Sequence, residues 1–297
     1  MRDINCIELE SRGVLSVAGT EAADFLQGLV SNDIAPAAAG RAVYSALLTP
    51  QGKYLHDFFV LLHAGAYLLD CEAARLTDLG QRLAAYKLRA DLELMDATED
   101  WCVAALLGDG AAALFGLDGA EMGTTATLAE GGLIYRDPRP PMPGLRALLP
   151  RAAGLAPILD MEEISAGAAA DYDSARIAAC VPDGSRDMTV GKATLMEFDF
   201  EGLRGVDFDK GCYVGQELTA RTKYRGLVRR RLKRVRIDGP LPPPGTPVMA
   251  NNMEAGEICS GLADEALALL RIDRSEEARA AGIPLKAGEA TVTPATS

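Results

Sequence analysis

Histidine is scarce in this sequence of 297 residues, and its cysteines are scattered. The chain has two histidines and six cysteines, and no two cysteines form a CxxC or CxxxC pair. A ferredoxin run or a zinc ribbon needs closely spaced ligands, so no protein-only metal site is expected. A disulfide framework is equally unexpected in a chain of this length without a secretion signal. These residues are His56, His63, Cys6, Cys71, Cys102, Cys180, Cys212 and Cys259.

Long apolar runs and an excess of positive charge are also missing. No apolar run approaches the roughly 20 residues that cross a bilayer, and the first residues lack the basic and apolar regions of a signal peptide. We therefore expect a cytoplasmic protein, or a protein of an organelle interior if a transit peptide has been removed, and no engagement of a membrane. The formal net charge of −12 argues against general attraction to nucleic acid or to an anionic membrane, so direct nucleic-acid binding is not expected.

The residues that are present indicate a globular protein, with 48% hydrophobic and 24% charged. Apolar periodicity predicts a mixture of helices and strands. The expected elements are a helix over 76–86, a hairpin joining 58–62 to 67–69, a buried strand over 101–107 and a helical stretch near 160–180. Short strands toward the end indicate a small β-rich module. We therefore expect a region over 1–235, built from two intertwined modules, and a terminal module over 236–297.

The segment Lys210-Gly211-Cys212-Tyr213-Val214-Gly215-Gln216-Glu217 carries the strongest chemical signal. Two glycines bracket a cysteine, and glycine permits backbone conformations with positive φ. A helix is expected to start after Gly215, which would place Cys212 near a helix N-terminus with Lys210 two residues away. Both features favour the thiolate. The alternative, an inert buried thiol, is the expectation for the other five cysteines.

Two acids are further candidates. Asp57 follows a turn and enters a strongly apolar strand, where it is either a partly desolvated functional acid or a solvated residue at a strand start. Glu197 lies between apolar neighbours, where it either binds the polar edge of a ligand or is the outward-facing residue of an alternating strand. Spacing alone does not decide between these alternatives.

Basic residues gather over 229–236, despite the net acidity. This run could contact phosphate or a polyglutamate tail, or it could be a solvated strand edge protected from aggregation by its charges. An RNA-binding helper working through 221–236 is a third functional hypothesis. No aromatic platform accompanies the run, which weakens a single-stranded nucleic-acid interpretation.

The segment 210–217, continued by Leu218-Thr219-Ala220-Arg221 and Gly226, resembles the signature of the YgfZ family. That family includes the mitochondrial iron–sulfur assembly factor and is related to the glycine-cleavage T-protein. Further matching segments follow in the same order: Phe25-Leu26-Gln27-Gly28, Ser31-Asn32-Asp33, Thr49-Pro50-Gln51-Gly52-Lys53, Tyr86-Lys87-Leu88-Arg89 and Ala266-Leu267-Ala268-Leu269-Leu270-Arg271. The resemblance spans nearly the whole chain.

The resemblance implies an α+β, T-protein-like fold, with mixed α/β modules and a small C-terminal β-barrel around a central channel. The implied cofactor is tetrahydrofolate or a one-carbon derivative, with Glu197 matching the family acid that faces the pterin. Asp57 falls where the T-protein places its catalytic acid, and Cys212 replaces the acid usual there in the T-protein. The implied cofactor-binding residues are Glu197, Lys210, Gly211, Tyr213, Gly215, Gln216, Glu217 and Arg221.

The function implied by the resemblance is support of 4Fe–4S enzyme maturation or repair, including enzymes that modify tRNA. Iron–sulfur client or assembly proteins would be the partners, and Cys212 would act as nucleophile, redox thiol or transient cluster ligand. The alternative is a folate-dependent one-carbon transferase or demethylase that uses Asp57. We expect an assembly factor rather than a turnover enzyme. One departure is Cys180, which replaces the usual glycine of a family turn between Arg176 and Pro182.

Overall fold

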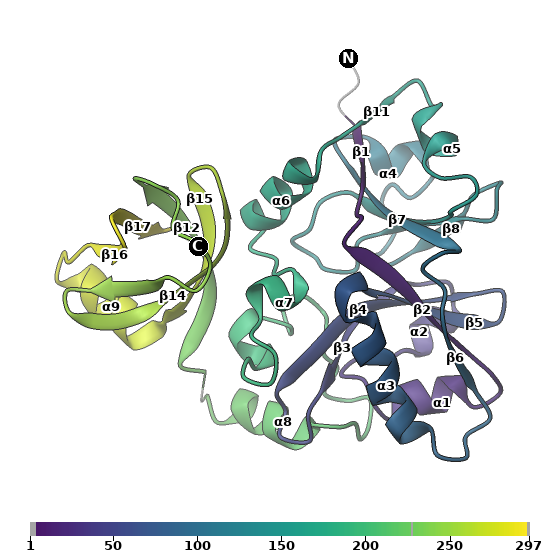
Figure 1. Ribbon diagram of the computed structural model, residues 1–297, viewed down its shortest axis with the longest axis horizontal. Helices are drawn as coiled ribbons and strands as arrows, with labels where there is room; N and C mark the ends of the chain where they lie inside the picture. The colour runs from purple at the N-terminus through teal and green to yellow at the C-terminus, as the bar shows by residue number, and fades with distance from the viewer. Residues whose placement is uncertain (1–3, 227, 296–297) are drawn as a thin grey trace. The chain divides into compact units, whose positions relative to one another are not determined.

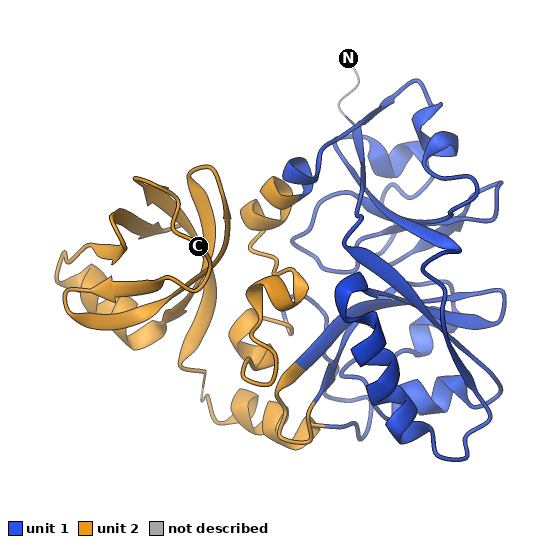
Figure 2. Ribbon diagram, viewed as in Figure 1, with its two compact units in different colours: residues 1–48, 55–172, 202–214 blue, residues 49–54, 173–201, 215–297 orange. Residues whose placement is uncertain are grey.

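The structure is a computed structural model that describes residues 4–226 and 228–295. The chain forms two compact units, coloured blue and orange in Figure 2. Unit 1 comprises Met1–Leu48, Leu55–Tyr172 and Gly202–Val214, and unit 2 comprises Thr49–Tyr54, Asp173–Glu201 and Gly215–Ser297. Each unit is therefore assembled from segments that are distant in sequence. None of the helices described is both long and apolar enough to span a membrane.

Unit 1 contains two sheets. The first has the strand order β11-β1-β7-β10-β9-β8. In it β1 pairs parallel with β11, whereas the other pairs are antiparallel. Its elements are β1 (Ile4–Glu8), β7 (Trp101–Leu107), α4 (Ala111–Leu114), β8 (Thr125–Thr127), β9 (Leu133–Arg136), β10 (Leu145–Pro150), α5 (Ala156–Leu159) and β11 (Ile164–Ala166). The strands and both helices bury one apolar cluster.

The second sheet of unit 1 has the order β3-β4-β5-β2-β6. Its elements are β2 (Arg12–Ala18), α1 (Ala22–Gln27), α2 (Ala35–Ala38), β3 (Val43–Leu48), β4 (Tyr54–His63), β5 (Ala66–Glu72), η1 (Ala73–Arg75), α3 (Leu76–Lys87) and β6 (Glu93–Asp96). The predicted hairpin is confirmed, because β4 and β5 pair antiparallel around Ala64-Gly65. The predicted helix over 76–86 and strand over 101–107 are confirmed as α3 and β7.

The predicted helical stretch near 160–180 is wrong in its first half. Residues Ile164–Ala166 form β11 beside β1, and helix α6 covers only Ala169–Ala178. The amide of Gly167 donates to the carbonyl oxygen of Cys6 at 2.8 Å. Pairing with a strand from the start of the chain therefore overrides the local helical spacing.

Unit 2 is built around a closed barrel with the strand order β12-β15-β14-β13-β16-β17, coloured green to yellow in Figure 1. The strands are β12 (Arg230–Asp238), β13 (Pro247–Ala250), β14 (Met253–Leu262), β15 (Glu265–Arg271), β16 (Leu285–Ala287) and β17 (Ala290–Pro294). The helices are α7 (Gly184–Asp187), η2 (Leu195–Phe198), α8 (Gln216–Tyr224) and α9 (Ile272–Ala280), together with most of α6. Strand β12 runs across the boundary that the sequence predicts after residue 235.

The barrel encloses its own core. Val235 and Ile237 of β12 point inward and pack with Leu270, Leu285 and Val292. Alternate residues of a strand face opposite sides, so Leu232, Arg234 and Arg236 project from the outer face of β12. Among the described residues, β12 has a strand edge only before Val235, because β15 pairs with β12 over Arg230–Arg236 whereas β17 pairs with it only over Val235–Asp238.

Candidate functional site

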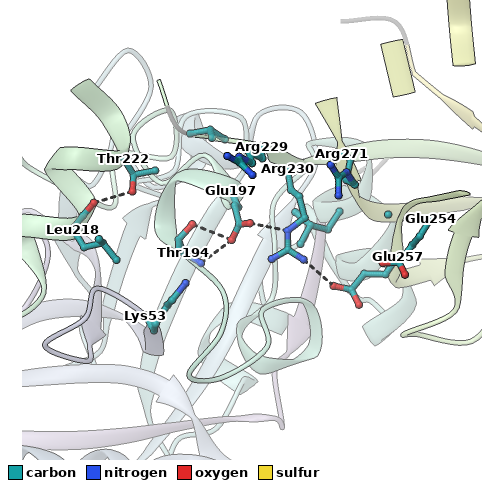
Figure 3. A pocket seen from close by; sticks show the side chains of 13 residues that line it. Lys53, Thr194, Glu197, Leu218, Thr222, Arg229, Arg230, Glu254, Glu257 and Arg271 are labelled. Carbon is teal, nitrogen blue, oxygen red and sulfur yellow. Dashed lines mark hydrogen bonds and ion pairs between the residues drawn. The ribbon is translucent and has the colours of Figure 1, made fainter. Parts of the chain in front are cut away.

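A polar cavity of about 470 Å³ lies within unit 2 (Figure 3). The turn before β4, η2, α8 and strands β12, β14 and β15 contribute to its wall. The lining residues are Lys53, Thr194, Glu197, Leu218, Thr222, Val228, Arg229, Arg230, Glu254, Gly256, Glu257, Leu269 and Arg271. Four of them are cationic and three are carboxylates, so the cavity suits a polar, charged ligand.

Glu197 is held in this cavity from two sides (Figure 3). Its Oε2 accepts hydrogen bonds from the backbone amide of Thr194 at 3.0 Å and from the Thr194 hydroxyl at 2.9 Å, and its Oε1 accepts one from Nε of Arg230 at 2.8 Å. The pair Thr194 and Glu197 is the capping box of η2. The outward-facing strand position that the sequence allowed is therefore wrong, since 195–198 form a 3₁₀ turn.

The carboxylate of Glu197 keeps acceptor capacity for a ligand. Each carboxylate oxygen accepts about two hydrogen bonds, and Oε1 receives one, from Arg230. The side chain is 12% exposed. A fixed, largely buried carboxylate of this kind can bind the N–H donors of a flat heterocyclic edge.

The cations of the cavity differ in their partners. Arg230 pairs with Glu197 and lies 3.9 Å from Oε1 of Glu257. In contrast, Lys53 and Arg229 form no ion pair with any residue of the described ranges. Their positive charge is not neutralised locally, so it favours a ligand that carries carboxylates.

Lys210 of the cysteine motif is a half-buried anchor in unit 1. Its Nζ donates to the carbonyl oxygens of Val30 at 2.6 Å and of Asn32 at 2.7 Å, and it lies 5.4 Å from the ring centre of Tyr213. Burial lowers the pKa of Lys210 to about 8. The hydroxyl of Ser31 also donates to the carbonyl oxygen of Gly205 at 2.7 Å. The segment after α1 therefore positions the start of the motif.

The two glycines of the motif have positive φ. Gly211 has φ +96° with open space where a side chain would be, and Gly215 has φ +86° as the N-cap of α8. The predicted helix start after Gly215 is confirmed. Between the glycines Cys212 is exposed, whereas Tyr213 is buried.

Helix α8 presents two faces at helical spacing. Leu218 and Thr222 line the cavity around Glu197. Glu217 and Arg221 form an ion pair four residues apart on the solvent side, with side chains 85% and 46% exposed. These two residues and Gln216, all predicted to bind the cofactor, are not among those that line the cavity.

Cys212 is the exposed cysteine of the chain. Cys6, Cys71, Cys102 and Cys259 are buried and Cys180 is half-buried. Burial raises the pKa of all five of these thiols, and it raises the pKa of Cys6 and of Cys71 to about 12. Within residues 4–226 and 228–295, no three or more His, Cys, Asp or Glu residues are grouped so that they could hold a metal ion.

Asp57 is a buried acid on β4 in unit 1, where it is 5% exposed. Its Oδ2 accepts a hydrogen bond from the Tyr44 hydroxyl at 2.9 Å. Burial and the charge of Asp57 raise the pKa of Tyr44. The Arg139 guanidinium stacks 5.3 Å from the Tyr44 ring centre and is itself paired with Asp137 at 2.7 Å. Asp57 therefore adjoins a network of buried ion pairs.

Most of the basic run over 229–236 is paired with acids. Arg230 pairs with Glu197, Arg231 with Asp199, Arg234 with Glu265 and Arg236 with Asp264. Residue 227, within the stretch proposed for RNA binding, lies outside the described residues. The local neutralisation of these arginines argues against a phosphate-binding strip.

The turn that carries Cys180 keeps a glycine-like conformation. Cys180 has φ +56°, and the amide of Val181 donates to the carbonyl oxygen of Arg176 at 2.8 Å. The left-handed conformation costs roughly 1–2 kcal/mol for a residue with a side chain. The buried ion pair of Arg176 with Asp187, at 2.9 Å, holds this turn in place.

Several cavity residues were not predicted. The sequence does not indicate six of the lining residues as ligand-binding: Lys53, Leu218, Thr222, Glu254, Glu257 and Arg271. Arg229 and Arg230 are predicted as part of the basic run that could contact phosphate or a polyglutamate tail. The spacing of Leu218 and Thr222 on α8 could have predicted that both line the same surface, because residues four apart share a helix face. The contributions of β14 and β15 depend on barrel closure and have no local signal.

The comparisons with known proteins agree with this architecture. Residues 2–117 match the family described as the GCVT N-terminal domain, and residues 229–297 match the family described as the CAF17 C-terminal beta-barrel domain. The glycine cleavage system aminomethyltransferase T of Bartonella henselae has a similar structure, with a TM-score of 0.78 and 16% identity. That similarity covers 100% of this chain and 86% of the other. The protein thus has the T-protein fold with a C-terminal barrel, which confirms the predicted fold class.

Relatives in sequence identify the family to which the chain belongs within this fold. The chain is 35% identical to the human mitochondrial iron-sulfur cluster assembly factor IBA57, over 89% of this chain and 77% of the relative. It is 32% identical to the mouse protein of the same name, over 90% of this chain and 77% of the relative. The chain belongs to the IBA57 family of iron–sulfur cluster assembly factors.

Two further predictions are decided by these relatives. Both carry the name of an assembly factor rather than of an enzyme, which agrees with the predicted preference for an assembly factor. The predicted cytoplasmic location is wrong, because the relatives are mitochondrial proteins, which points away from the cytoplasm.

Proposed function

We propose that this chain is a tetrahydrofolate-binding accessory protein for the maturation or repair of iron–sulfur enzymes. The clients in this proposal are 4Fe–4S enzymes, including those that modify tRNA. The observation that carries it is the exposure of Cys212 in a chain whose other five thiols are buried or half-buried. We also propose that the motif over 210–217 has the same role here as the similar motif of YgfZ proteins.

Cys212 would act on an iron–sulfur cluster as cargo. Thiolates are the usual protein ligands of such clusters, and four are ordinarily needed. One exposed cysteine therefore suits a transient ligand: one iron–thiolate bond forms to Cys212 while one bond to a thiolate of a client or assembly partner breaks. A nucleophile or a redox thiol must also be exposed. The exposure of Cys212 is therefore compatible with all three roles.

The cavity around Glu197 supports the folate part of the proposal. Glu197 would accept hydrogen bonds from the pterin edge, and Lys53 and Arg229 would pair with the glutamate carboxylates. Bound tetrahydrofolate would supply a carrier for one-carbon units. Lys210, Gly211, Tyr213 and Gly215 would contribute by fixing the backbone of the motif, and Gln216, Glu217 and Arg221 through the first turns of α8.

Calorimetric titration with tetrahydrofolate tests the cavity. A Glu197→Gln variant keeps the acceptor oxygen that caps η2 but removes the charge, and we expect about tenfold or greater weakening, as is typical when a charged hydrogen bond is lost. Glu289→Gln is the matched control, since Glu289 is exposed and is not among the residues that line the cavity. Equal affinity of wild type and Glu197→Gln would show that folate does not use this carboxylate.

Complementation tests the maturation role. A bacterium without its own family member would be supplied with the wild type, with Cys212→Ala or with Cys180→Ala, and a 4Fe–4S enzyme would be assayed. We expect rescue by the wild type and by Cys180→Ala but not by Cys212→Ala. Rescue by all three would make Cys212 dispensable. Rescue by none, with all proteins folded and abundant, would contradict the maturation role.

The alternative one-carbon transferase would need Asp57 to meet a substrate. Asp57 is instead 5% exposed and accepts a hydrogen bond from Tyr44. Incubation of folate-saturated protein with a methylamine-type donor separates the two proposals. Formation of methylene-tetrahydrofolate that is lost in Asp57→Asn would favour the transferase.

A further inference from the structure

The turn over 49–53 leads into β4 and adjoins the cavity around Glu197. The amide of Gly52 donates to the carbonyl oxygen of Thr49 at 2.8 Å, and the amide of Thr49 donates to the carbonyl oxygen of Lys53, also at 2.8 Å. Pro50 and Gly52 stand at the second and fourth positions, where type I turns favour these residues. The turn is therefore closed by its own hydrogen bonds, and Lys53 at its end lines the cavity.

Gly52 packs against the first turn of α8 and leaves no room there for a side chain. Its φ is +66°, and a Cβ atom at this position would lie 3.0 Å from the carbonyl oxygen of Gly215 and 3.0 Å from Cβ of Leu218. Oγ1 of Thr219 would lie 3.4 Å away. Ordinary contacts to a Cβ atom are 3.4–4 Å, so a side chain here would displace the turn or the helix by a few tenths of an ångström.

The α8 atoms that face Gly52 are fixed by hydrogen bonds. Gly215 is the N-cap of the helix, and its carbonyl oxygen accepts from the amide of Thr219 at 3.4 Å and from the Thr219 hydroxyl at 3.1 Å. Thr219 is itself buried. A displacement of Gly215 would therefore carry with it the residues of α8 that follow.

The turn is held on its other side by Tyr54, the residue after Lys53. The amide of Tyr54 donates to the carbonyl oxygen of Ala193 at 2.9 Å. Ala193 comes directly before Thr194, which caps η2. Lys53 thus stands between two fixed contacts, that of Gly52 with α8 and that of Tyr54 with the segment leading into η2.

These contacts bring three walls of the cavity together. Lys53, Thr194 and Leu218 all line it, and they come from the turn, from the start of η2 and from α8 (Figure 3). The groups of a binding site must be held to within about 0.5 Å of the productive geometry. A displacement of a few tenths of an ångström at Gly52 is therefore large enough to affect binding.

We propose that Gly52 is a positioning residue of this cavity. Because it has no side chain, the turn over 49–53 lies directly on α8, and this contact sets the separation between Lys53 and the face of α8 that carries Leu218 and Thr222. Any larger residue at position 52 widens the cavity at this end. The identity of the ligand rests on the proposed function, whereas the contact itself does not depend on a ligand.

Calorimetry with tetrahydrofolate compares Gly52→Ala with Gly65→Ala. Gly65 is the matched control because its φ is also positive, at +84°, but a Cβ atom there would meet nothing within 4 Å. Both variants thus carry the backbone strain of a left-handed alanine, and only Gly52→Ala adds the contact with α8. We expect Gly52→Ala to bind about fivefold more weakly, the effect of losing one hydrogen bond, and Gly65→Ala to bind like the wild type.

A Gly52→Asn variant separates the contact from the strain. Asparagine tolerates the left-handed conformation better than alanine, but it still carries a Cβ atom. It should therefore bind tetrahydrofolate no more tightly than Gly52→Ala. Wild-type affinity in either variant at position 52, or equal weakening in Gly65→Ala, would overturn the proposal.

Amide chemical shifts of the ligand-free protein test the contact separately from the folate hypothesis. Gly52→Ala should shift the amides of 216–222 in α8, and Gly65→Ala should leave them in place. If wild-type protein binds no tetrahydrofolate, the folate part of the proposed function is wrong, and these shifts still decide on Gly52. Unchanged α8 amides in Gly52→Ala would overturn the positioning role.

Discussion

Lys210 donates a hydrogen bond from its ammonium group to the carbonyl oxygen of Asn32, at 2.7 Å. A second bond reaches the carbonyl oxygen of Val30. The two residues of the first bond lie 178 positions apart in sequence, so the start of the cysteine motif is fixed by a loop from the beginning of the chain. The charge is retained in a half-buried place because both carbonyl dipoles point at it.

Replacing Lys210 by Met should therefore destabilise unit 1. The two carbonyl oxygens would lose their donor, and an unsatisfied buried acceptor costs about 1–3 kcal/mol. Urea unfolding measures the change, with Lys192→Met, an exposed lysine, as a control that should stay within about 0.5 kcal/mol. A Lys210→Met protein as stable as the wild type would show that the two hydrogen bonds of Lys210 make no net contribution to the free energy of unfolding.

Alkylation should select one thiol of the six. Cys212 is exposed, whereas burial both shields the other thiols and raises their pKa, and the thiolate is the reactive form. Native protein treated briefly with iodoacetamide at neutral pH should carry a single adduct by mass spectrometry, at Cys212. Cys212→Ser should carry none, and a first adduct on any other cysteine would contradict the structure.

His56 should make stability depend on pH. It is 3% exposed, and its Nε2 lies 2.8 Å from Oδ2 of Asp78. Burial, helped by the charge of Arg75 and opposed by the bond with Asp78, lowers its pKa from 6.5 to about 4. Between these values the unfolded chain binds more protons than the folded one, so stability falls as the pH falls. The expected loss from pH 6.5 to 5.5 is about 1 kcal/mol.

Urea unfolding at several pH values checks this dependence. His56→Gln should remove this part of the slope, because glutamine does not titrate. His63→Gln, a change at the other histidine of the chain, should leave it in place. If the wild type and His56→Gln lose the same stability between pH 6.5 and 5.5, the neutral state assigned to His56 is wrong.

Arg176 should be among the most sensitive positions of unit 2. Its buried guanidinium bonds to Asp173 at 2.6 Å, to Asp187 at 2.9 Å and to the Ser260 hydroxyl at 2.9 Å. Arg176→Met would leave the fully buried Asp187 without its cation, and breaking a buried pair on one side costs about 3–5 kcal/mol.

Arg186→Gln provides the matched comparison for Arg176. Arg186 pairs with Asp173 and Asp183 but is 48% exposed, so its removal should cost no more than about 1 kcal/mol. Thermal and urea unfolding of both variants measure the difference. Similar losses in the two would mean that burial does not set the strength of this network.

Elements fixed by local periodicity could be predicted from the sequence. Helix α3, strand β7 and the β4–β5 hairpin have their apolar residues at the spacing that each element requires. The helix start after Gly215 follows from glycine chemistry alone. In contrast, β11 exists because it pairs with β1 from the start of the chain, and no local pattern in 164–166 reports that partner.

The residues of the candidate site also fall into those whose surroundings could be predicted from the sequence and those whose surroundings could not. The setting of Glu197 could have been predicted, because Thr194-Leu195-Met196-Glu197 is a capping-box pattern, although the apolar neighbours of Glu197 also suggest an alternating strand. The setting of Asp57 could not be predicted, since its partner Tyr44 comes from another strand. Arg139, which stacks on Tyr44 and pairs with Asp137, comes from a loop distant in sequence. Local chemistry thus identifies a candidate acid, and tertiary packing decides what surrounds it.

The alternation of Arg230 and Arg231 across β12 has a consequence for insertions and deletions. Register with β15 decides which of these arginines faces Glu197 and which lies on the same strand face as Val235 and Ile237. A slip of one residue turns every side chain of a strand to the other face. Such a slip in β12 would move Val235 and Ile237 out of the core and bring the side chains of Arg234 and Arg236 into it. A single substitution along β12 can change the cavity around Glu197 or the barrel core separately, whereas a one-residue deletion in β12 would disrupt both together.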